Sequence, residues 1–204
     1  MRLLPVRKCR VLLLVLWLTA AAPATEEPPL SFWRQDTVTG GWNGMRTSLL
    51  EQGVSLEAVY TGEMFSNLSG GLRRKAVYLD NVDLMLTIDT ERAFGWEGGR
   101  FFLYGLGNQG GNPSEHIGDI QIASNIEAPD TWKVFEAWFQ QNLFRNRLSL
   151  LAGLYDVNSE FAVLKTADLF LNSSFGIGHA FAQSGKNGPS IFPATSLGLR
   201  MAAK

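Results

Sequence analysis

Carboxylate side chains recur along this chain of 204 residues at positions that alternate with apolar residues. Two carboxylates that flank a glycosidic bond are the catalytic equipment of most glycoside hydrolases. The acidic residues of the alternating segments are Glu57, Glu63, Asp83, Asp89 and Glu136. They fall on the polar faces of three predicted strands, and this regular placement favours a solvated surface or a water-filled lumen over a catalytic pair.

The other patterns that could support catalysis lack the context they need. Residues 105–110 match the dinucleotide fingerprint G-x-G-x-x-G, but the fingerprint requires a helix to begin there, and Gly111, Asn112 and Pro113 follow instead. His116 and His179 have no partner at metal-ligand spacing, and no G-x-S-x-G elbow occurs. We therefore expect no enzyme activity, no metal site and no cofactor.

The N-terminal residues 1–24 are predicted to be a secretory signal peptide. Four basic residues precede an apolar run at 11–18, and alanines at 20, 22 and 24 supply a cleavage site. The run is shorter than the roughly 20 residues that a spanning helix needs. Cleavage after Ala24 would remove Cys9, the single cysteine, and so exclude disulfide scaffolds. It would also leave 14 basic against 19 acidic residues, a net charge of −5 that argues against a nucleic-acid partner.

Residues 25–53 are expected to join this signal to the first strand. Residues 25–40, which include a Glu-Glu-Pro-Pro stretch at 26–29, are predicted to be a linker. Residues 41–53 predict a short amphipathic helix that stops at Gly53, because their apolar side chains recur at helical spacing. These side chains are Trp42, Met45, Leu49 and Leu50.

From residue 54 onward the hydrophobic period falls from 3.6 to 2, which predicts β-strands. The alternation is clearest in residues 54–65 and 81–89, and it returns in 135–140, 148–155 and 196–201. In residues 135–140 it sets Phe135, Ala137 and Phe139 on the apolar face. Glycine- and asparagine-rich turns separate most strands, whereas residues 108–133 and 158–193 form longer loops. Short turns between successive strands predict antiparallel hairpins.

Two all-β architectures fit this alternation. A transmembrane barrel turns its apolar faces to lipid and its polar faces to a lumen, whereas a soluble β-sandwich turns its apolar faces to a packed core. Residues 54–65 and 81–89 match the roughly 9–11 residues with which a tilted strand crosses a bilayer. The alternation of short turns with long loops is typical of outer-membrane barrels. The barrel is therefore the preferred interpretation.

Three stretches, in order, resemble the carbohydrate-selective porin family of Gram-negative outer membranes, the OprB type. The first is Gly41-Trp42-Asn43-Gly44-Met45-Arg46-Thr47, which leads to Gly53-Val54. The second runs from Tyr60-Thr61-Gly62 to Asn67-Leu68-Ser69-Gly70-Gly71. The third is Asp156-Val157-Asn158-Ser159-Glu160-Phe161-Ala162, followed by Phe170-Leu171-Asn172-Ser173-Ser174-Phe175-Gly176. Their joint occurrence over residues 41–200 makes the resemblance specific.

The resemblance implies an antiparallel transmembrane β-barrel that lets sugars diffuse passively through a water-filled lumen. Because members of the family resemble sixteen-stranded barrels, residues 54–204 are expected to be the N-terminal part, about half a barrel, of a longer or a paired chain. The implied partners are mono- or small oligosaccharides, outer-membrane lipid and the barrel-assembly machinery, with self-association a further expectation. The basic run at 73–75 is a candidate contact with lipopolysaccharide. The implied location is the bacterial outer membrane.

Polar side chains can replace the water that a sugar sheds at a constriction. The candidate pore-lining and sugar-contact residues are Glu57, Glu63, Asp83, Arg100, Glu136, Trp138, Asp156, Glu160 and Asn172. Trp138 could stack on the apolar face of a pyranose or belong to an interfacial aromatic belt.

Two further functions remain open at this point. One is an exported, soluble β-sandwich that binds polysaccharide at its surface. The other is a small closed outer-membrane barrel that acts as an adhesin or a structural protein.

Overall fold

The computed structural model describes residues 37–203, so the predicted signal peptide and the linker up to residue 36 lie outside the described residues. The strands are β1 (Val54–Ser66), β2 (Ala76–Asp89), β3 (Gly99–Gly110), β4 (Thr131–Leu143), β5 (Leu148–Tyr155) and β6 (Ser196–Ala203). The α-helices are short: α1 (Met45–Glu51), α2 (Thr90–Phe94), α3 (Ser114–Ile117) and α4 (His179–Ala182). The 3₁₀ turns are η2 (Trp42–Gly44), η3 (Val157–Ser159), η4 (Ala167–Leu169) and η5 (Ser173–Phe175).

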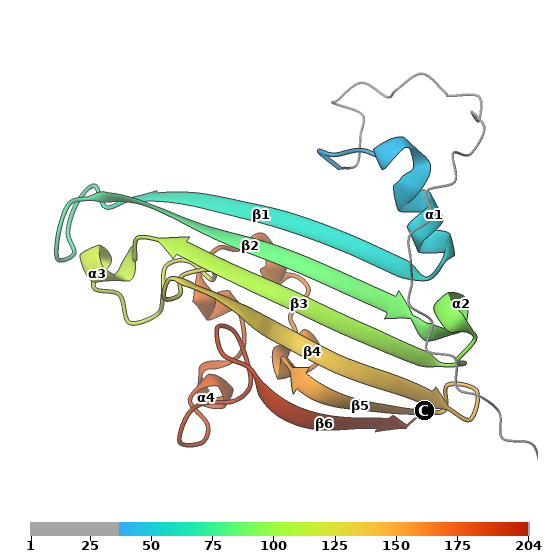
Figure 1. The fold of residues 1–204 in the computed structure, drawn as a ribbon. Helices are drawn as coiled ribbons and strands as arrows, with labels where there is room; N and C mark the ends of the chain where they lie inside the picture. Colours follow the sequence, from blue (N-terminus) through green and yellow to red (C-terminus); the bar gives the residue numbers. More distant parts are fainter. Residues whose placement is uncertain (1–36, 204) are drawn as a thin grey trace, which may run out of the picture. The chain divides into compact units, whose positions relative to one another are not determined.

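The six strands form one antiparallel sheet in which each strand pairs with the next along the chain (Figure 1). The sheet does not close on itself, because β1 and β6 lie at its two edges. An antiparallel all-β fold was predicted, and it is confirmed. A β-sandwich would need a second sheet packed on the apolar face, and the described residues form a single sheet. The fingerprint at 105–110 lies within β3 and is followed by residues that open no helix until Ser114.

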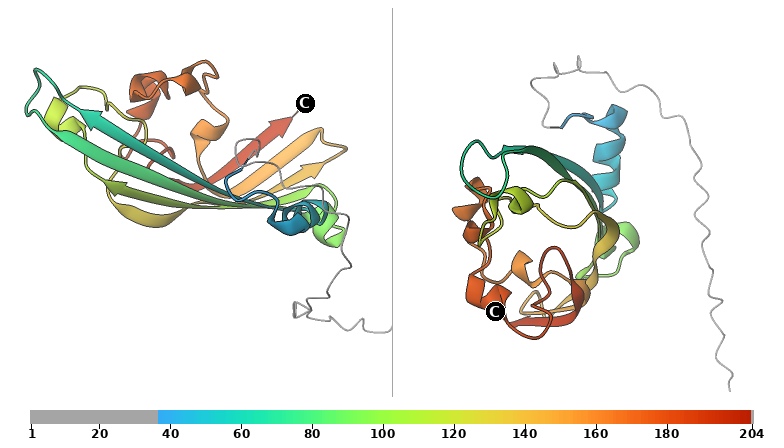
Figure 2. Two further views of the ribbon diagram at one scale, coloured as in Figure 1. Left: turned by 90° about the horizontal axis from the view of Figure 1, so that it is seen from above. Right: turned by 90° about the vertical axis from the view of Figure 1, so that its left-hand side faces the viewer.

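The sheet is strongly curved. Seen end-on, it bends into a trough, and the segment between β5 and β6 lies on the open side of the bend (Figure 2). The loops at 67–75, 111–130 and 156–195 leave one end of the strands, while α2 and the turn at 144–147 connect them at the other. We call the side of the sheet that contacts the long loops the concave face. The opposite side is the convex face.

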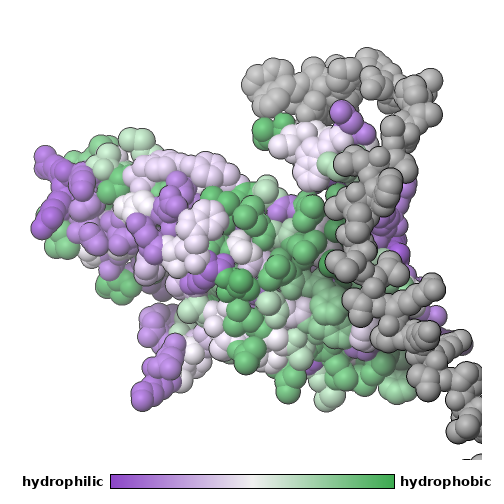
Figure 3. Space-filling view, viewed as in Figure 1, coloured by the Kyte–Doolittle hydropathy of each residue, from purple (hydrophilic) through white to green (hydrophobic). Residues whose placement is uncertain are grey.

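The alternation of side chains gives the two faces opposite character. Since residues paired across antiparallel strands share a face, the register that pairs Leu56 with Leu86, and Leu86 with Leu103, places all three on the convex face. Large apolar side chains are exposed there, and the hydrophobic surface lies over the strands, whereas the loop end is hydrophilic (Figure 3). The buried apolar residues lie on the concave face: Val77, Leu79, Leu106, Phe135, Leu151 and Tyr155.

One residue departs from the predicted alternation. Phe135 was expected on the same face as Ala137 and Phe139, but the register between β3 and β4 shifts between Tyr104 and Gly105. A β-bulge of this kind re-aims the side chains beside it. Phe135 is 3% exposed and its ring packs 5.0 Å from that of Tyr104, on the concave face. The bulge therefore places Phe135 beside Glu136 on the same side of the sheet.

The helices are local features of the chain between the strands. The Asp89 carboxylate caps α2 by accepting hydrogen bonds from the backbone N–H groups of Glu91 and Arg92, at 3.0 and 3.2 Å. The segment at 41–53 contains η2 and then α1, because Asn43 and Gly44 have positive φ angles of 54° and 84° that interrupt a continuous helix. Within residues 37–203, no helix is both long enough and apolar enough to cross a membrane.

Gly153 carries a prediction about the stability of the sheet. It lies on β5 opposite Trp138, has a φ of 144°, and a Cβ atom there would lie 2.5 Å from the Cα of Trp138. We expect Gly153→Ala to lower the free energy of unfolding by at least about 1–3 kcal/mol, the usual cost of such a backbone conformation in a residue with a side chain. The measurement is urea unfolding of the protein in lipid vesicles. Gly198→Ala is the matched control.

Gly198 pairs with Gly153 on the neighbouring strand, and the nearest heavy atom to a Cβ there is Tyr155 Cδ1, at 3.9 Å. The control should therefore leave the unfolding midpoint almost unchanged. Equal losses in the two variants would show that the backbone at Gly153 has no special requirement.

Candidate functional site

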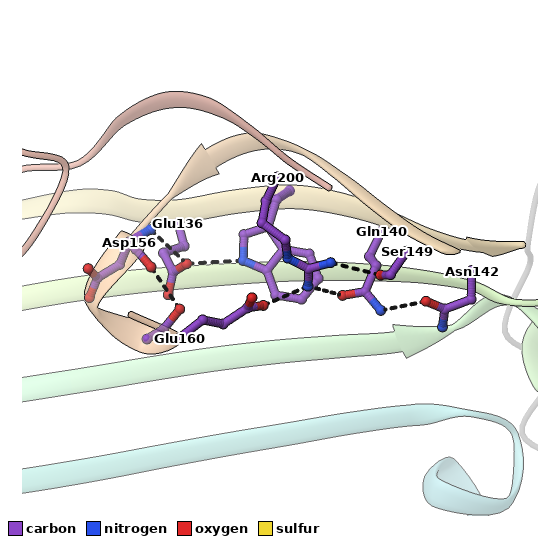
Figure 4. Close-up of polar contacts among 9 residues, drawn as sticks. Glu136, Gln140, Asn142, Ser149, Asp156, Glu160 and Arg200 are labelled. Carbon is purple, nitrogen blue, oxygen red and sulfur yellow. Dashed lines mark hydrogen bonds and ion pairs between the residues drawn. The ribbon is translucent and has the colours of Figure 1, made fainter. Parts of the chain in front are cut away.

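A row of polar side chains runs along the concave face where β4, β5 and β6 meet the segment that follows β5 (Figure 4). Alternation places Glu136, Trp138, Gln140 and Asn142 on one side of β4, with Ser149 on β5 and Arg200 on β6 facing the same way. Asp156 and Glu160 join them from the segment after β5. We call these eight residues the polar ladder.

Arg200 links the strands of the ladder to the loop. Its Nη1 donates a hydrogen bond to Ser149 Oγ at 2.8 Å, and its Nη2 donates to Gln140 Oε1 at 3.0 Å. Nη2 also forms an ion pair with Glu160 Oε1 at 2.6 Å. The Arg200 side chain is only 10% exposed. A charge so well shielded from water requires partners of this kind, and the planar guanidinium can engage all three at once.

Glu136 is the buried acid of the ladder, at 6% exposure. Its Oε2 accepts hydrogen bonds from Trp138 Nε1 at 3.0 Å and from the backbone N–H of Asp156 at 3.1 Å. Among the described residues, no lysine or arginine forms an ion pair with it. The Glu136 carboxylate therefore holds the start of the segment after β5 against β4, and both groups that donate hydrogen bonds to it are neutral.

Asp156 begins the segment that carries Glu160. Its carboxylate accepts a hydrogen bond from the backbone N–H of Asn158 at 2.8 Å, and its own carbonyl accepts one from Ser159 Oγ at 2.7 Å. Burial raises the pKa of the Asp156 carboxyl above its ordinary value, and the bond from Asn158 offsets only part of this effect. Asp156 consequently becomes neutral at a higher pH than an exposed aspartate does.

Aromatic rings lie directly beside these polar groups. The centroid of the Trp138 ring lies 4.9 Å from that of Phe102, and Phe102 in turn packs edge-on to Tyr104 at 6.3 Å. The Tyr104 hydroxyl donates a 2.6 Å hydrogen bond to Asp83. Apolar rings next to donors and acceptors suit a ligand that is apolar on its faces and hydroxylated at its rim.

The structure brings four of the nine predicted site residues together in the polar ladder, and the register places Glu57, Glu63, Asp83 and Arg100 on the same concave face outside it. Glu136, Trp138, Asp156 and Glu160 belong to the polar ladder. Of the rest, Glu57 and Arg100 are exposed, Glu63 accepts a hydrogen bond from Ser124, and Asp83 accepts one from Tyr104. Asn172 caps η5 by accepting a bond from the backbone N–H of Ser174 at 2.9 Å.

Four ladder residues are absent from the predicted site: Gln140, Asn142, Ser149 and Arg200. The signal for Arg200 was present, because the alternation of residues 196–201 sets it on the polar face of its strand. Its partner Glu160 lies 40 residues away along the chain, and alternation does not indicate which polar side chains meet. Within residues 37–203, no cluster of His, Cys, Asp and Glu is arranged to hold a metal ion.

Comparison with known proteins agrees with this geometry. A family description, "Carbohydrate-selective porin, OprB family", matches residues 73–204. Porin B of Pseudomonas aeruginosa is 31% identical over 163 residues, which cover 75% of this chain and 35% of Porin B. The high-pH structure of OprB from Pseudomonas putida is 26% identical, with a TM-score of 0.73 over 83% of this chain and 42% of that one. The chain thus spans less than half the length of either relative.

The family match covers more than half of the chain, and the fold is similar to that of the OprB structure. The chain belongs to the OprB family of carbohydrate-selective porins.

Proposed function

We propose that this chain forms part of the wall of an outer-membrane channel through which sugars diffuse passively. The observation that carries the proposal is the opposition of the two faces: the convex face exposes large apolar side chains, and the concave face carries the polar ladder. In a barrel of this kind the apolar face contacts lipid and the polar face lines an aqueous lumen. Family membership supports a channel over an enzyme.

The polar ladder is the proposed sugar-contact site. Its carboxylates, amides and guanidinium replace the water that hydroxyl groups shed, and Trp138 offers a ring face to the apolar side of a pyranose. Glu57, Glu63, Asp83, Arg100 and Asn172 lie outside the ladder, and a direct role in sugar contact is proposed only for ladder residues. Lipid, lipopolysaccharide, the assembly machinery and other copies of the chain remain expected partners.

The test is liposome swelling with the protein expressed from its complete reading frame. Swelling in glucose should exceed that of empty vesicles, should be slower in a disaccharide, and should not require an ion gradient or an energy source. Sugar entry equal to that of empty vesicles would contradict the proposal. Recovery of the protein in the soluble periplasmic fraction would instead support a polysaccharide-binding protein.

The raised pKa of Asp156 predicts a pH dependence of ion selectivity. As the pH falls through this raised pKa, Asp156 loses its negative charge before an exposed aspartate would. The preference for K⁺ over Cl⁻, measured as a reversal potential across planar bilayers, should therefore decline at a pH above the ordinary aspartate range. Asp156→Asn should lack this step and be less cation-selective at neutral pH.

The same shift has a consequence for stability. Because burial disfavours the charged form, the contribution of Asp156 to stability is present at low pH and is lost as the pH rises through the folded-state pKa. At neutral pH, Asp156→Asn should thus be as stable as the wild type or more so, since asparagine can still accept the bond from Asn158. Lower stability at neutral pH, together with an unchanged selectivity profile, would contradict this prediction.

A further inference from the structure

The loop between α3 and β4 folds against the concave face and is tied there to the first strand. Ser124 Oγ donates a 2.6 Å hydrogen bond to Glu63 Oε2 on β1, 61 residues earlier in the chain. Ser124 Oγ also accepts a hydrogen bond from the backbone N–H of Ile126 at 3.2 Å, and Ser124 is 1% exposed. We call residues 118–130 the inner loop. Among the described residues, the bond from Ser124 to Glu63 is its only hydrogen bond to β1.

The inner loop is bonded on its other side to the long loop at 156–195. The backbone N–H of Asn125 donates to Leu171 O at 2.7 Å. The backbone N–H and the hydroxyl of Ser173 both donate to Ile122 O, at 3.1 and 3.0 Å. These bonds connect two loops that leave the same end of the sheet. They link β1, the inner loop and the long loop in series, and the long loop carries Asp156 and Glu160.

We propose that Glu63 is a positioning residue which, through Ser124, holds the inner loop and the long loop across the lumen and so sets the largest sugar that passes. A hydrogen bond to a charged acceptor is stronger than a neutral one, and loss of the acceptor leaves a buried hydroxyl unsatisfied. Loss of this single tie to β1 frees the inner loop at Ser124, while Ile126 O and Asp130 Oδ1 stay bonded to Asn108 and Gly110 of β3. The proposal rests on the proposed channel function and assigns Glu63 to loop placement rather than to sugar contact.

The first test measures size selectivity. Glu63→Ala and Ser124→Ala should raise the swelling rate in a trisaccharide relative to glucose at least threefold, with glucose entry itself little changed. Glu63→Gln should keep the wild-type ratio, because its amide oxygen can still accept the bond from Ser124. Thr61→Ala, two positions away on the same face of β1, is the matched control and should also keep it.

The second test does not depend on transport. Hydrogen exchange at the backbone amides of Asn125 and Ser173, which bond the two loops, should be faster in Glu63→Ala than in the wild type and unchanged in Thr61→Ala. Wild-type size ratios together with wild-type exchange in Glu63→Ala would overturn the role of Glu63 even if glucose passes normally. If the wild type passes no sugar, the proposed channel function is wrong. Even then, faster exchange in Glu63→Ala would support the role of the Glu63–Ser124 hydrogen bond in holding the loops, and unchanged exchange would reject it.

Discussion

Leu103→Arg is expected to lower the free energy of unfolding in lipid vesicles by about 2–4 kcal/mol, the cost of an arginine on the lipid-facing side of a barrel near the middle of the bilayer. Leu103 is 44% exposed on the convex face, between Leu86 on β2 and Ala137 on β4. These residues line a shallow apolar groove together with Phe101 and Phe139. Urea unfolding followed by tryptophan fluorescence gives the free energy directly.

Thr87→Arg is the matched control. Thr87 lies on β2 and pairs with Ser55 and Phe102, so it faces the concave side at nearly the same height along the strands. A guanidinium there can reach the water of the lumen and should cost less than about 1 kcal/mol, as surface substitutions usually do. The opposite result, a stable Leu103→Arg and an unstable Thr87→Arg, would show that the apolar face is turned away from lipid.

The sequence predicts the two faces well because a strand has a fixed side-chain period. Glu57 and Glu63 share the polar face of β1, and Arg200 lies on the polar face of β6, as the alternation indicates. Alternation fails at Phe135, because one bulged residue reverses the faces beyond it and leaves no mark in the hydrophobic pattern. The face that each side chain occupies is thus predictable from the sequence of its strand, except beyond a point where pairing with the neighbouring strand shifts the register.

The contacts of the site are less predictable than its faces. Arg200 meets Glu160, and Glu63 meets Ser124, only because loops of many residues return to particular places on the sheet. The hydrophobic period of the strands and the composition of the loops do not predict the path that a long loop takes back to the sheet. The family motif at 156–160 points to the correct segment for the ladder, but the sequence gives no reason to prefer Glu160 over Glu57 as the partner of a cation. The position of Arg200 depends on the register between β5 and β6, and the position of Glu160 depends on the path of the loop that follows β5.

Arg200→Ala is expected to make the channel more cation-selective. The substitution removes the one cation of the polar ladder and leaves Glu160 without its ion-pair partner. A unit charge about 4 Å from a permeating ion is worth about 1 kcal/mol in water, and because it acts with opposite sign on K⁺ and Cl⁻, its loss changes the difference between them by about 2 kcal/mol, or about 30-fold in relative permeability. The ratio of K⁺ to Cl⁻ permeability, from reversal potentials in a KCl gradient, should rise by about that factor.

Arg200→Lys separates the charge of Arg200 from its geometry. Lysine keeps the positive charge but lacks the planar fork that engages Ser149, Gln140 and Glu160 at once. Ion selectivity should therefore stay near that of the wild type, while glucose entry falls because Gln140 and Ser149 lose their common donor. If Arg200→Lys instead kept glucose entry at the wild-type level, charge alone would explain the role of Arg200. If neither variant changed selectivity or sugar entry, the polar ladder would not line the path of the solute.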